Sequence, residues 1–192
     1  MDADNIYLPR VAVLDRVEDE IQDVKTFHWH FEDPEDQRAF LRFRPGQFAQ
    51  VSLFGAGEMP LSLPPSPTEG RTFFTVRKVG TCTGALHDLA PGAKFGVRGP
   101  YGNGFPMESF HGKDLIFVAG GIGLIPLRSC IIYALANRAK YGRIQIFLGA
   151  RAPKDLMYRH NLREWEAMSG VECHLTVDRG EEGWTGNVRW HS

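Results

Sequence analysis

The chain has 192 residues, of which 43% are hydrophobic and 23% are charged, and 22 basic residues nearly balance 23 acidic ones. This composition excludes a disordered or collagen-like chain, and the near-zero net charge indicates neither nucleic acid nor an anionic membrane as a partner. Because no apolar run has the length of a membrane span and residues 1–7 lack a signal-peptide core, we expect a cytoplasmic protein without a membrane span.

The first 110 residues contain short strand patterns separated by turns. A polar loop is expected at residues 32–37, a turn at 55–60 and a short helix after Gly84. Many short strands with turns between them are typical of a small antiparallel barrel. The predicted strands are residues 10–17, 24–31, 48–54, 61–63, 71–79 and 95–98.

A glycine turn follows the next strand and is the most informative stretch of the sequence. Residues 115–119 are an unbroken apolar run of strand length, which suits a parallel strand buried on both faces. Gly120, Gly121 and Gly123 then remove every Cβ from the turn, and Pro126 suits the first turn of the helix that follows. A strand, a bare turn and a helix N-terminus in this order predict a binding site for a diphosphate, although such turns also occur for packing reasons.

Strands and helices alternate after this turn. Helices are expected at residues 125–139 and 155–168, and strands at 143–148 and 171–177. This βαβαβ order predicts a parallel sheet that binds its ligand at the carboxyl ends of the strands. We therefore expect two domains, residues 1–111 and residues 112–192.

Cysteines and histidines give no metal-binding pattern. Cys82, Cys130 and Cys173 are odd in number and far apart, which fits a reducing compartment. Cys130 lies among apolar residues and is expected to be buried. His28 and His30 share a strand face without a third ligand nearby, so a solvated face is favoured over a metal site and we expect no metal in this chain.

Four motifs occur in fixed order: P-x-S at residues 60–62, G-x-x-T-x-x-L at 80–86, G-P-Y-G at 99–102 and A-G-G-I-G-x-x-P at 119–126. Together they resemble the ferredoxin-NADP reductase superfamily over residues 7–188. The similarity is greatest to its anaerobic branch, which includes hydrogenase gamma subunits, the B subunit of anaerobic sulfite reductase and the electron-transfer subunit of dihydroorotate dehydrogenase. The resemblance implies a six-stranded antiparallel flavin-binding barrel followed by a parallel α/β nucleotide-binding domain.

On the flavin side, the resemblance places the Arg-x-Tyr-Ser motif of the family on residues 59–62. Ser62 would then be the catalytic residue, at the flavin N5 edge where hydride arrives. Met59 and Leu61 replace the arginine and the tyrosine of the family, and Arg77 could supply the missing positive charge. For Arg77 and Lys78 a solvated strand edge is the alternative. The flavin-binding residues implied are Pro60, Leu61, Ser62, Leu63, Val76, Arg77, Lys78, Gly80, Thr81, Cys82 and Thr83.

On the nucleotide side, the resemblance implies that the glycine turn holds the diphosphate of NAD(P)H. Asp178 would accept a hydrogen bond from a free ribose 2′-hydroxyl and favours NADH, whereas Arg179 leaves NADPH open. FAD is favoured over FMN as the flavin. The nucleotide-binding residues implied are Gly120, Gly121, Gly123, Gly149, Ala150, Arg151, Asp178 and Arg179.

The C-terminal end departs from the family pattern. Only three strands fit into the second domain where the family has about five, so we expect a domain truncated at its C-terminus. The cysteine segment that binds a [2Fe-2S] cluster in the anaerobic branch is not found in the sequence. A sheet edge exposed by the truncation could pair with a second copy of the chain.

The first functional hypothesis is an FAD-dependent oxidoreductase subunit that passes electrons between NAD(P)H and an iron–sulfur or metal centre of a partner subunit. The second is a catalytically incomplete nucleotide-binding or assembly module of such a complex. A self-contained reductase of an aromatic-ring oxygenase is disfavoured, because no ferredoxin-like cysteine cluster is visible.

Overall fold

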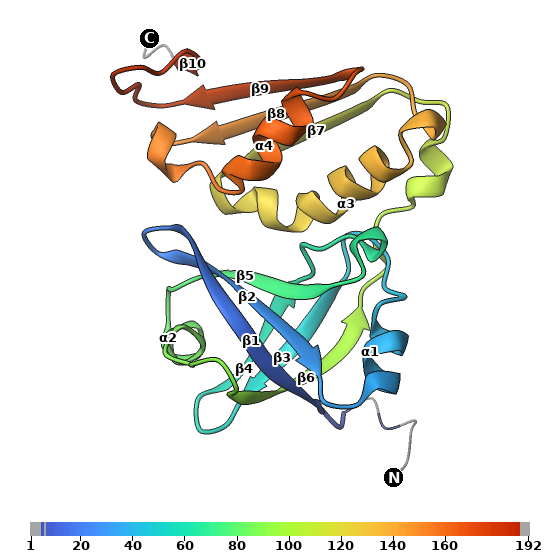
Figure 1. Ribbon diagram of the computed structural model, residues 1–192, viewed down its shortest axis with the longest axis vertical. Helices are drawn as coiled ribbons and strands as arrows, with labels where there is room; N and C mark the ends of the chain where they lie inside the picture. The colour runs from blue at the N-terminus through green and yellow to red at the C-terminus, as the bar shows by residue number, and fades with distance from the viewer. Residues whose placement is uncertain (1–4, 6, 189–192) are drawn as a thin grey trace.

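A computed structural model of the chain describes residue 5 and residues 7–188. The chain folds into two halves that lie one above the other, with an antiparallel barrel at the N-terminal end and an α/β sheet at the C-terminal end (Figure 1). Each half has a hydrophobic core cluster. The division at residues 111 and 112 stays a prediction.

As predicted, the barrel is a six-stranded antiparallel sheet. Its strands follow the order β4-β3-β6-β1-β2-β5. The edge strands β4 and β5 contact each other, so the sheet curls. Alternating aromatic residues on β2 fill its centre, and Trp29 stacks on Phe74 with ring centroids 5.0 Å apart. The strands are β1 (Arg10–Ile21), β2 (Val24–Phe31), β3 (Phe48–Leu53), β4 (Gly57–Ser62), β5 (Thr72–Arg77) and β6 (Lys94–Tyr101).

Two local predictions in the barrel are wrong. The expected polar loop at residues 32–37 is largely a helix, α1 (Pro34–Phe40). The Asp33 side chain caps it by accepting a 2.7 Å hydrogen bond from the Glu35 N–H, and Pro34 occupies its first turn, where its missing N–H costs little. The expected turn at residues 55–60 is shorter, because β4 already begins at Gly57.

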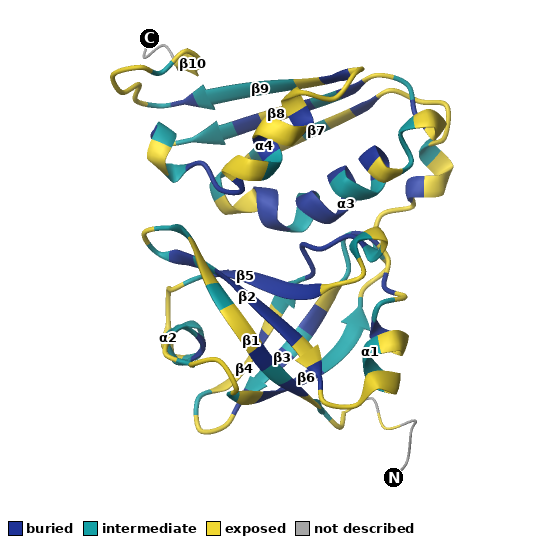
Figure 2. Ribbon diagram, in the orientation of Figure 1, coloured by how far each residue is buried: buried dark blue, intermediate teal, exposed yellow. Residues whose placement is uncertain are grey.

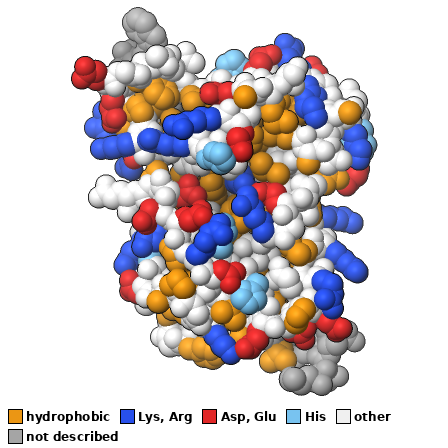
Figure 3. Space-filling model, viewed as in Figure 1, with side chains coloured by type: hydrophobic (Ala, Val, Ile, Leu, Met, Phe, Trp, Pro, Cys, Tyr) orange, Lys and Arg blue, Asp and Glu red, His pale blue; other side chains and the backbone are white. Residues whose placement is uncertain are grey.

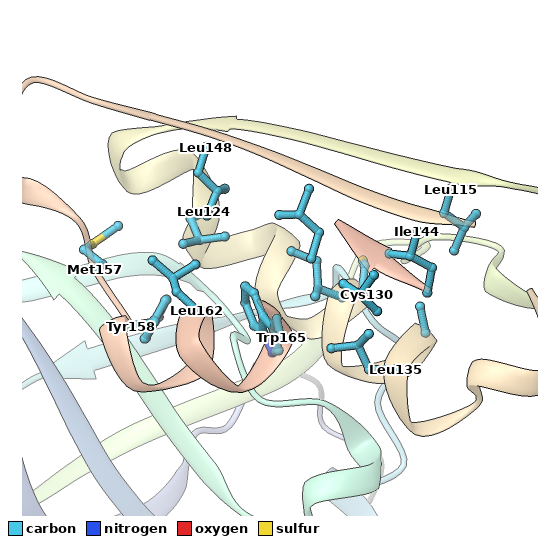
Figure 4. Close-up of a cluster of buried hydrophobic side chains, with 14 of the residues drawn as sticks. Leu115, Leu124, Cys130, Leu135, Ile144, Leu148, Met157, Tyr158, Leu162 and Trp165 are labelled. Carbon is cyan, nitrogen blue, oxygen red and sulfur yellow. The ribbon is translucent and has the colours of Figure 1, made fainter. Parts of the chain in front are cut away.

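The second half is a four-stranded parallel sheet in the order β10-β9-β8-β7. Helices α3 and α4 cover the face of this sheet that is turned towards the barrel (Figure 1). Between them lies a core that includes Cys130, which is 1% exposed as predicted (Figure 4). The elements are β7 (Leu115–Gly120), α3 (Leu124–Ala136), β8 (Ile144–Ala150), α4 (Arg159–Glu166), β9 (Val171–Val177) and β10 (Asn187–Val188).

The prediction that the apolar strand before the glycine turn is buried on both faces is wrong. β7 is an edge strand, and only its side towards α3 is covered. Ile116 is 64% and Val118 is 70% exposed, and Phe147 of β8 next to Val118 is also exposed. The apolar outer face (Ile116, Val118 and Phe147) is therefore open to solvent, as the yellow residues of β7 show in Figure 2.

Two further expectations for this half need correction. The helix expected at residues 155–168 is limited to α4, preceded by the short 3₁₀ helix η5 (Pro153–Asp155). A fourth short strand, β10, pairs in parallel with β9, where only three strands were expected. Its two residues are too few for a sequence pattern to identify.

Short helical turns connect the larger elements. They are α2 (Thr81–His87), η1 (Pro67–Glu69), η2 (Met107–Phe110), η3 (Gly121–Gly123) and η4 (Arg138–Lys140). The tip of the β1–β2 hairpin reaches the second half, where Val24 is part of the α/β core. Within the described part of the chain, no helix combines the length and the apolar character needed to cross a membrane.

Candidate functional site

The glycine turn (residues 120–123) joins the carboxyl end of β7 to the first turn of α3. Gly121 has φ +51°, a left-handed conformation that favours glycine. No side chain caps the N-terminus of α3, so backbone N–H groups of its first turn remain without side-chain acceptors. A Cβ added at Gly120, Gly121 or Gly123 would meet no other atom within 4 Å. The turn is therefore open on its outer side and able to accept an anion.

The predicted nucleotide-binding residues at the ends of the three long strands lie side by side. Gly120 is opposite Gly149, and Ala150 is opposite Val177. Backbone hydrogen bonds continue this alignment past the strand ends, because the Asp178 N–H donates to the Ala150 carbonyl at 3.0 Å. A shallow pocket opens beside the turn and is lined by Ala119, Gly121, Leu124, Leu148, Gly149, Ala150, Asp155, Leu156 and Met157.

Charged side chains of both signs border this edge of the sheet. The Arg179 N–H donates to the Arg151 carbonyl at 3.0 Å, and both side chains are exposed. Arg151 also lies 3.7 Å from the carboxylate of Asp155. Asp155 ends η5 and lines the pocket, and the N-cap of α4 is Tyr158.

Ser62 lies at the last position of β4, opposite Phe48 of β3. Ser62 and Leu61 are half-buried and Pro60 is exposed, so these side chains reach the barrel surface. Within the described residues, the Ser62 hydroxyl has no hydrogen-bond partner. Met59 and Leu63 instead point into the barrel core, so their side chains are not available to a ligand.

The predicted basic residues of β5 and its extension are both paired. Arg77 lies 3.0 Å from Asp23, and Lys78 lies 3.2 Å from Asp88. The Val76 side chain is buried in the barrel core. Arg77 and Lys78 could therefore reach an anionic ligand only by leaving or sharing these carboxylates.

Residues 80–83 form the start of α2, which has only seven residues. The Thr83 hydroxyl already accepts 2.9 Å hydrogen bonds from the N–H groups of Val79 and Gly80. The Cys82 thiol donates to the Ala56 carbonyl at 2.8 Å, so it fixes α2 to the β3–β4 turn. A Cβ added at Gly80 would meet no atom within 4 Å. Thr81 is exposed, whereas the N–H groups of Val79 and Gly80 are already paired.

The histidines do not form a ligand cluster. His28 is buried against Phe73 and Glu18, contrary to the expectation of a solvated face, and its burial lowers its pKa. His30 is exposed and bonds to Asp15 at 2.6 Å. In the portion of the chain that the structure describes, no three His, Cys, Asp or Glu side chains are grouped to hold a metal ion.

Sequence reasoning missed a charged contact between the two halves. Arg128 of α3 is 2% exposed and pairs with Glu69 of the barrel at 2.8 Å. The available signal was a lone arginine within the otherwise apolar helix sequence LIPLRSCIIYALA. Figure 3 shows acidic and basic side chains gathered along the waist between the halves.

The chain is similar to a known oxidoreductase domain and to subunits of redox complexes. Residues 117–190 match the oxidoreductase NAD-binding domain. The sulfhydrogenase 1 subunit gamma of Pyrococcus furiosus is 45% identical over 173 residues, which cover 89% of this chain and 58% of that protein. The second half of the chain thus matches an oxidoreductase NAD-binding family, and the chain as a whole is similar to a hydrogenase gamma subunit. This similarity confirms the resemblance inferred from the four motifs.

A second relative is an electron-transfer subunit. A probable dihydroorotate dehydrogenase B (NAD(+)), electron transfer subunit, of Methanothermobacter thermautotrophicus is 32% identical over 186 residues, covering 95% of this chain and 63% of that protein. The chain thus spans about 60% of the length of these two curated relatives.

Solved structures share the fold of this chain at low sequence identity. The cytochrome b5 reductase domain of Ulva prolifera nitrate reductase has a TM-score of 0.76 at 20% identity, covering 96% of this chain and 79% of that chain. The ferredoxin reductase in carbazole 1,9a-dioxygenase has a TM-score of 0.75 at 20% identity, covering 94% and 54%. The predicted fold class is therefore confirmed.

Proposed function

We propose that this chain binds FAD and NAD(P)H and serves as the electron-transfer part of a larger redox complex. Two relatives named as a sulfhydrogenase gamma subunit and an electron transfer subunit support this role. The observation that carries the proposal is the uncapped glycine turn, which opens at the carboxyl ends of β7 and β8. A bound flavin would accept a hydride from nicotinamide and release electrons singly to a metal or iron–sulfur centre of a partner subunit.

The pyridine nucleotide is assigned to the carboxyl edge of the parallel sheet. The open space in front of Gly120, Gly121 and Gly123 fits a diphosphate, whose charge the uncapped N–H groups and the helix dipole of α3 would stabilise. Gly149 and Ala150, aligned with this turn by the strand register, would lie beside the ribose units.

The preference between NADH and NADPH depends on the residues after β8 and β9. A carboxylate at Asp178 accepts a hydrogen bond from a 2′-hydroxyl and repels a 2′-phosphate, whereas Arg151 and Arg179 attract the phosphate. The segments that follow β8 and β9 are connected here by backbone hydrogen bonds, so these side chains act on the same region of the ligand. We assign NADH as the preferred donor and NADPH as a weaker one.

The flavin is assigned to the barrel surface around the end of β4 and the start of α2. The unpaired Ser62 hydroxyl can donate to a ring nitrogen at the surface, and Pro60 and Leu61 flank it. The exposed Thr81, at the start of α2 and beside the uncrowded Gly80, would bind the flavin phosphates. Met59, at the position of the family arginine, is buried and carries no charge. Arg77 is therefore proposed to replace this arginine, by exchanging its contact with Asp23 for one with a phosphate.

Reconstitution with flavin tests this function. The protein is mixed with FAD or FMN, freed of excess flavin and titrated without oxygen with NADH or NADPH. We expect a yellow protein that retains FAD better than FMN and is bleached by NADH at lower concentrations than by NADPH. A protein that stays colourless, or that stays yellow with both nucleotides, would exclude an electron-transfer role for this chain.

The second candidate function is an assembly module that keeps the fold and a nucleotide but does not turn over. The exposed outer face of β7 and its unpaired edge favour this candidate, because they offer apolar surface and backbone groups to another chain. A nucleotide that binds without bleaching bound flavin is the result this candidate predicts. Both candidates place the chain in the cytoplasm.

A further inference from the structure

A positively charged side chain is buried where the two halves meet. Arg128 lies on α3, five positions after the last glycine of the glycine turn, and is 2% exposed. Burying a guanidinium is unfavourable unless its N–H groups are paired. Three of its nitrogen atoms make hydrogen bonds, and two of these three donate to the barrel.

The barrel supplies a carboxylate and a carbonyl to this guanidinium. Nη1 and Nη2 of Arg128 donate to the two carboxylate oxygens of Glu69 at 2.8 and 3.1 Å, which makes a bidentate ion pair. Nη1 also donates to the Pro64 carbonyl at 3.0 Å. Glu69 is fixed in turn, because it accepts hydrogen bonds from the Ser66 N–H and from Arg71.

The same guanidinium is held on its other sides by α4 and by aromatic rings. Its Nε donates to Asn161 of α4 at 3.0 Å. The planar group lies between the rings of Phe73 and Tyr158, at 5.1 and 5.3 Å from their centroids. Tyr158 also ties α4 to the barrel, because its N–H donates to Glu20 at 3.1 Å.

Arg128 thereby connects the two proposed cofactor sites by short segments of chain. On one side, the Pro64 carbonyl lies two residues after Ser62. On the other side, Arg128 belongs to the helix that begins directly after the glycine turn. We propose that Arg128 is a positioning residue, which holds the Ser62 end of β4 in fixed register with the glycine turn. This inference rests on the proposed function in one respect only, namely that the fixed position serves to bring the two cofactor sites together.

The geometry calls for arginine specifically. Its planar fork reaches both oxygens of Glu69 and the Pro64 carbonyl at once, while its face packs between two rings. A lysine at this position keeps the charge but presents one nitrogen, so it cannot make these contacts together. Arg128→Lys should therefore weaken the fixed position of the Ser62 end of β4 relative to the glycine turn. The lysine charge still pairs with the Glu69 carboxylate in the interface.

Hydrogen exchange followed by mass spectrometry tests the link without any cofactor. We expect Arg128→Lys to raise amide exchange by about tenfold in both residues 62–70 and residues 121–130, with residues 24–31 unchanged. Glu69→Gln, made from the other half, should give the same paired response. The matched control is Arg138→Lys, because Arg138 bonds only to carbonyls of its own half and should leave residues 62–70 unchanged. A response confined to one segment, or an equal response to Arg138→Lys, would overturn the proposal.

Rapid mixing of the FAD-loaded protein with NADH tests what the register is for. A misplacement of about 1 Å costs on the order of 100-fold in rate, so Arg128→Lys should slow the limiting rate of flavin reduction 10- to 100-fold with unchanged NADH affinity. An unchanged limiting rate, or a loss of NADH affinity instead, would contradict the positioning role. If the unaltered protein is not reduced by NADH, the proposed function fails, while hydrogen exchange still decides the role of Arg128.

Discussion

At the scale of single residues, Ser62 is the side chain on which the proposed chemistry depends most. Ser62→Ala removes a hydroxyl from the end of β4 and should slow flavin reduction by NADH about 100-fold, the lower end of the cost of losing one hydrogen bond to developing charge. Flavin affinity should change little, because a single half-exposed hydroxyl contributes little to it. Rapid-mixing absorbance measures the rate. Ser52→Ala is the matched control, since Ser52 donates to Glu58 near the other end of the same β3–β4 pair. Equal rates for the two variants would contradict the role assigned to Ser62.

Glu69 predicts a pH dependence of stability. Burial by itself would raise its pKa, but hydrogen bonds and charge from Arg128, with the Ser66 N–H and Arg71, hold it below the usual 4.5. A carboxylate whose pKa is lowered by folding stabilises the native state fully above pH 4.5, and this contribution is lost as the pH falls through the folded pKa. The melting temperature of Glu69→Gln should therefore lie below that of the unaltered protein at pH 7, with the difference narrowing below pH 4.5. A difference that stays constant to the lowest pH would contradict the ion pair.

At the scale of elements, the strand–turn–helix unit around residues 120–123 carries the proposed nucleotide site. Gly120 has φ −118°, which any residue can adopt, whereas Gly121 has φ +51°. Gly120→Val therefore adds a side chain in front of the turn without straining the backbone. We expect at least about tenfold weaker NADH binding by calorimetry, because phosphate contacts of one to two kcal/mol are displaced. Flavin binding should persist, and equal loss of both ligands would mean that the two sites are misassigned.

Patterned elements could be predicted from the sequence, whereas their neighbours could not. Strict alternation identified β2, and the glycine turn identified both its strand and its helix. The apolar run of β7 indicated burial on two faces, but burial requires a covering layer that a strand sequence does not reveal. The helix α1 was missed because Pro34 lies in a polar stretch typical of a loop, although Asp33 before it is a good N-cap.

The candidate site was predicted in part for the same reason. Backbone features such as Gly120 and Gly149 depend on local sequence and are brought together by the register of parallel strands. Side-chain roles depend on partners that are distant in sequence. Arg77 meets Asp23, Cys82 meets the Ala56 carbonyl, and Arg128 meets Glu69, and none of these pairings follows from spacing along the chain.

At the scale of the whole molecule, the unpaired edge of β7 predicts self-association. The strand carries no charged residue or proline, and its Ile116 and Val118 side chains are largely exposed. Sedimentation at increasing concentration should show association of the unaltered protein, and Val118→Lys should shift it towards the monomer. Phe54→Lys is the matched control, because Phe54 is 96% exposed on a barrel turn far from this edge in sequence. An identical effect of both lysines, or a monomer at every concentration, would contradict pairing through β7.

In the proposed molecule, two anion-binding turns, one in each half, bring a flavin and a nicotinamide together. The decisive experiment is a crystal structure of the protein with FAD and the oxidised pyridine nucleotide. We predict the nucleotide diphosphate at Gly120, Gly121 and Gly123, and the flavin ring against Ser62 with its phosphates at Gly80 and Thr81. Either ligand bound elsewhere, or two rings that do not face each other between the halves, would contradict the account.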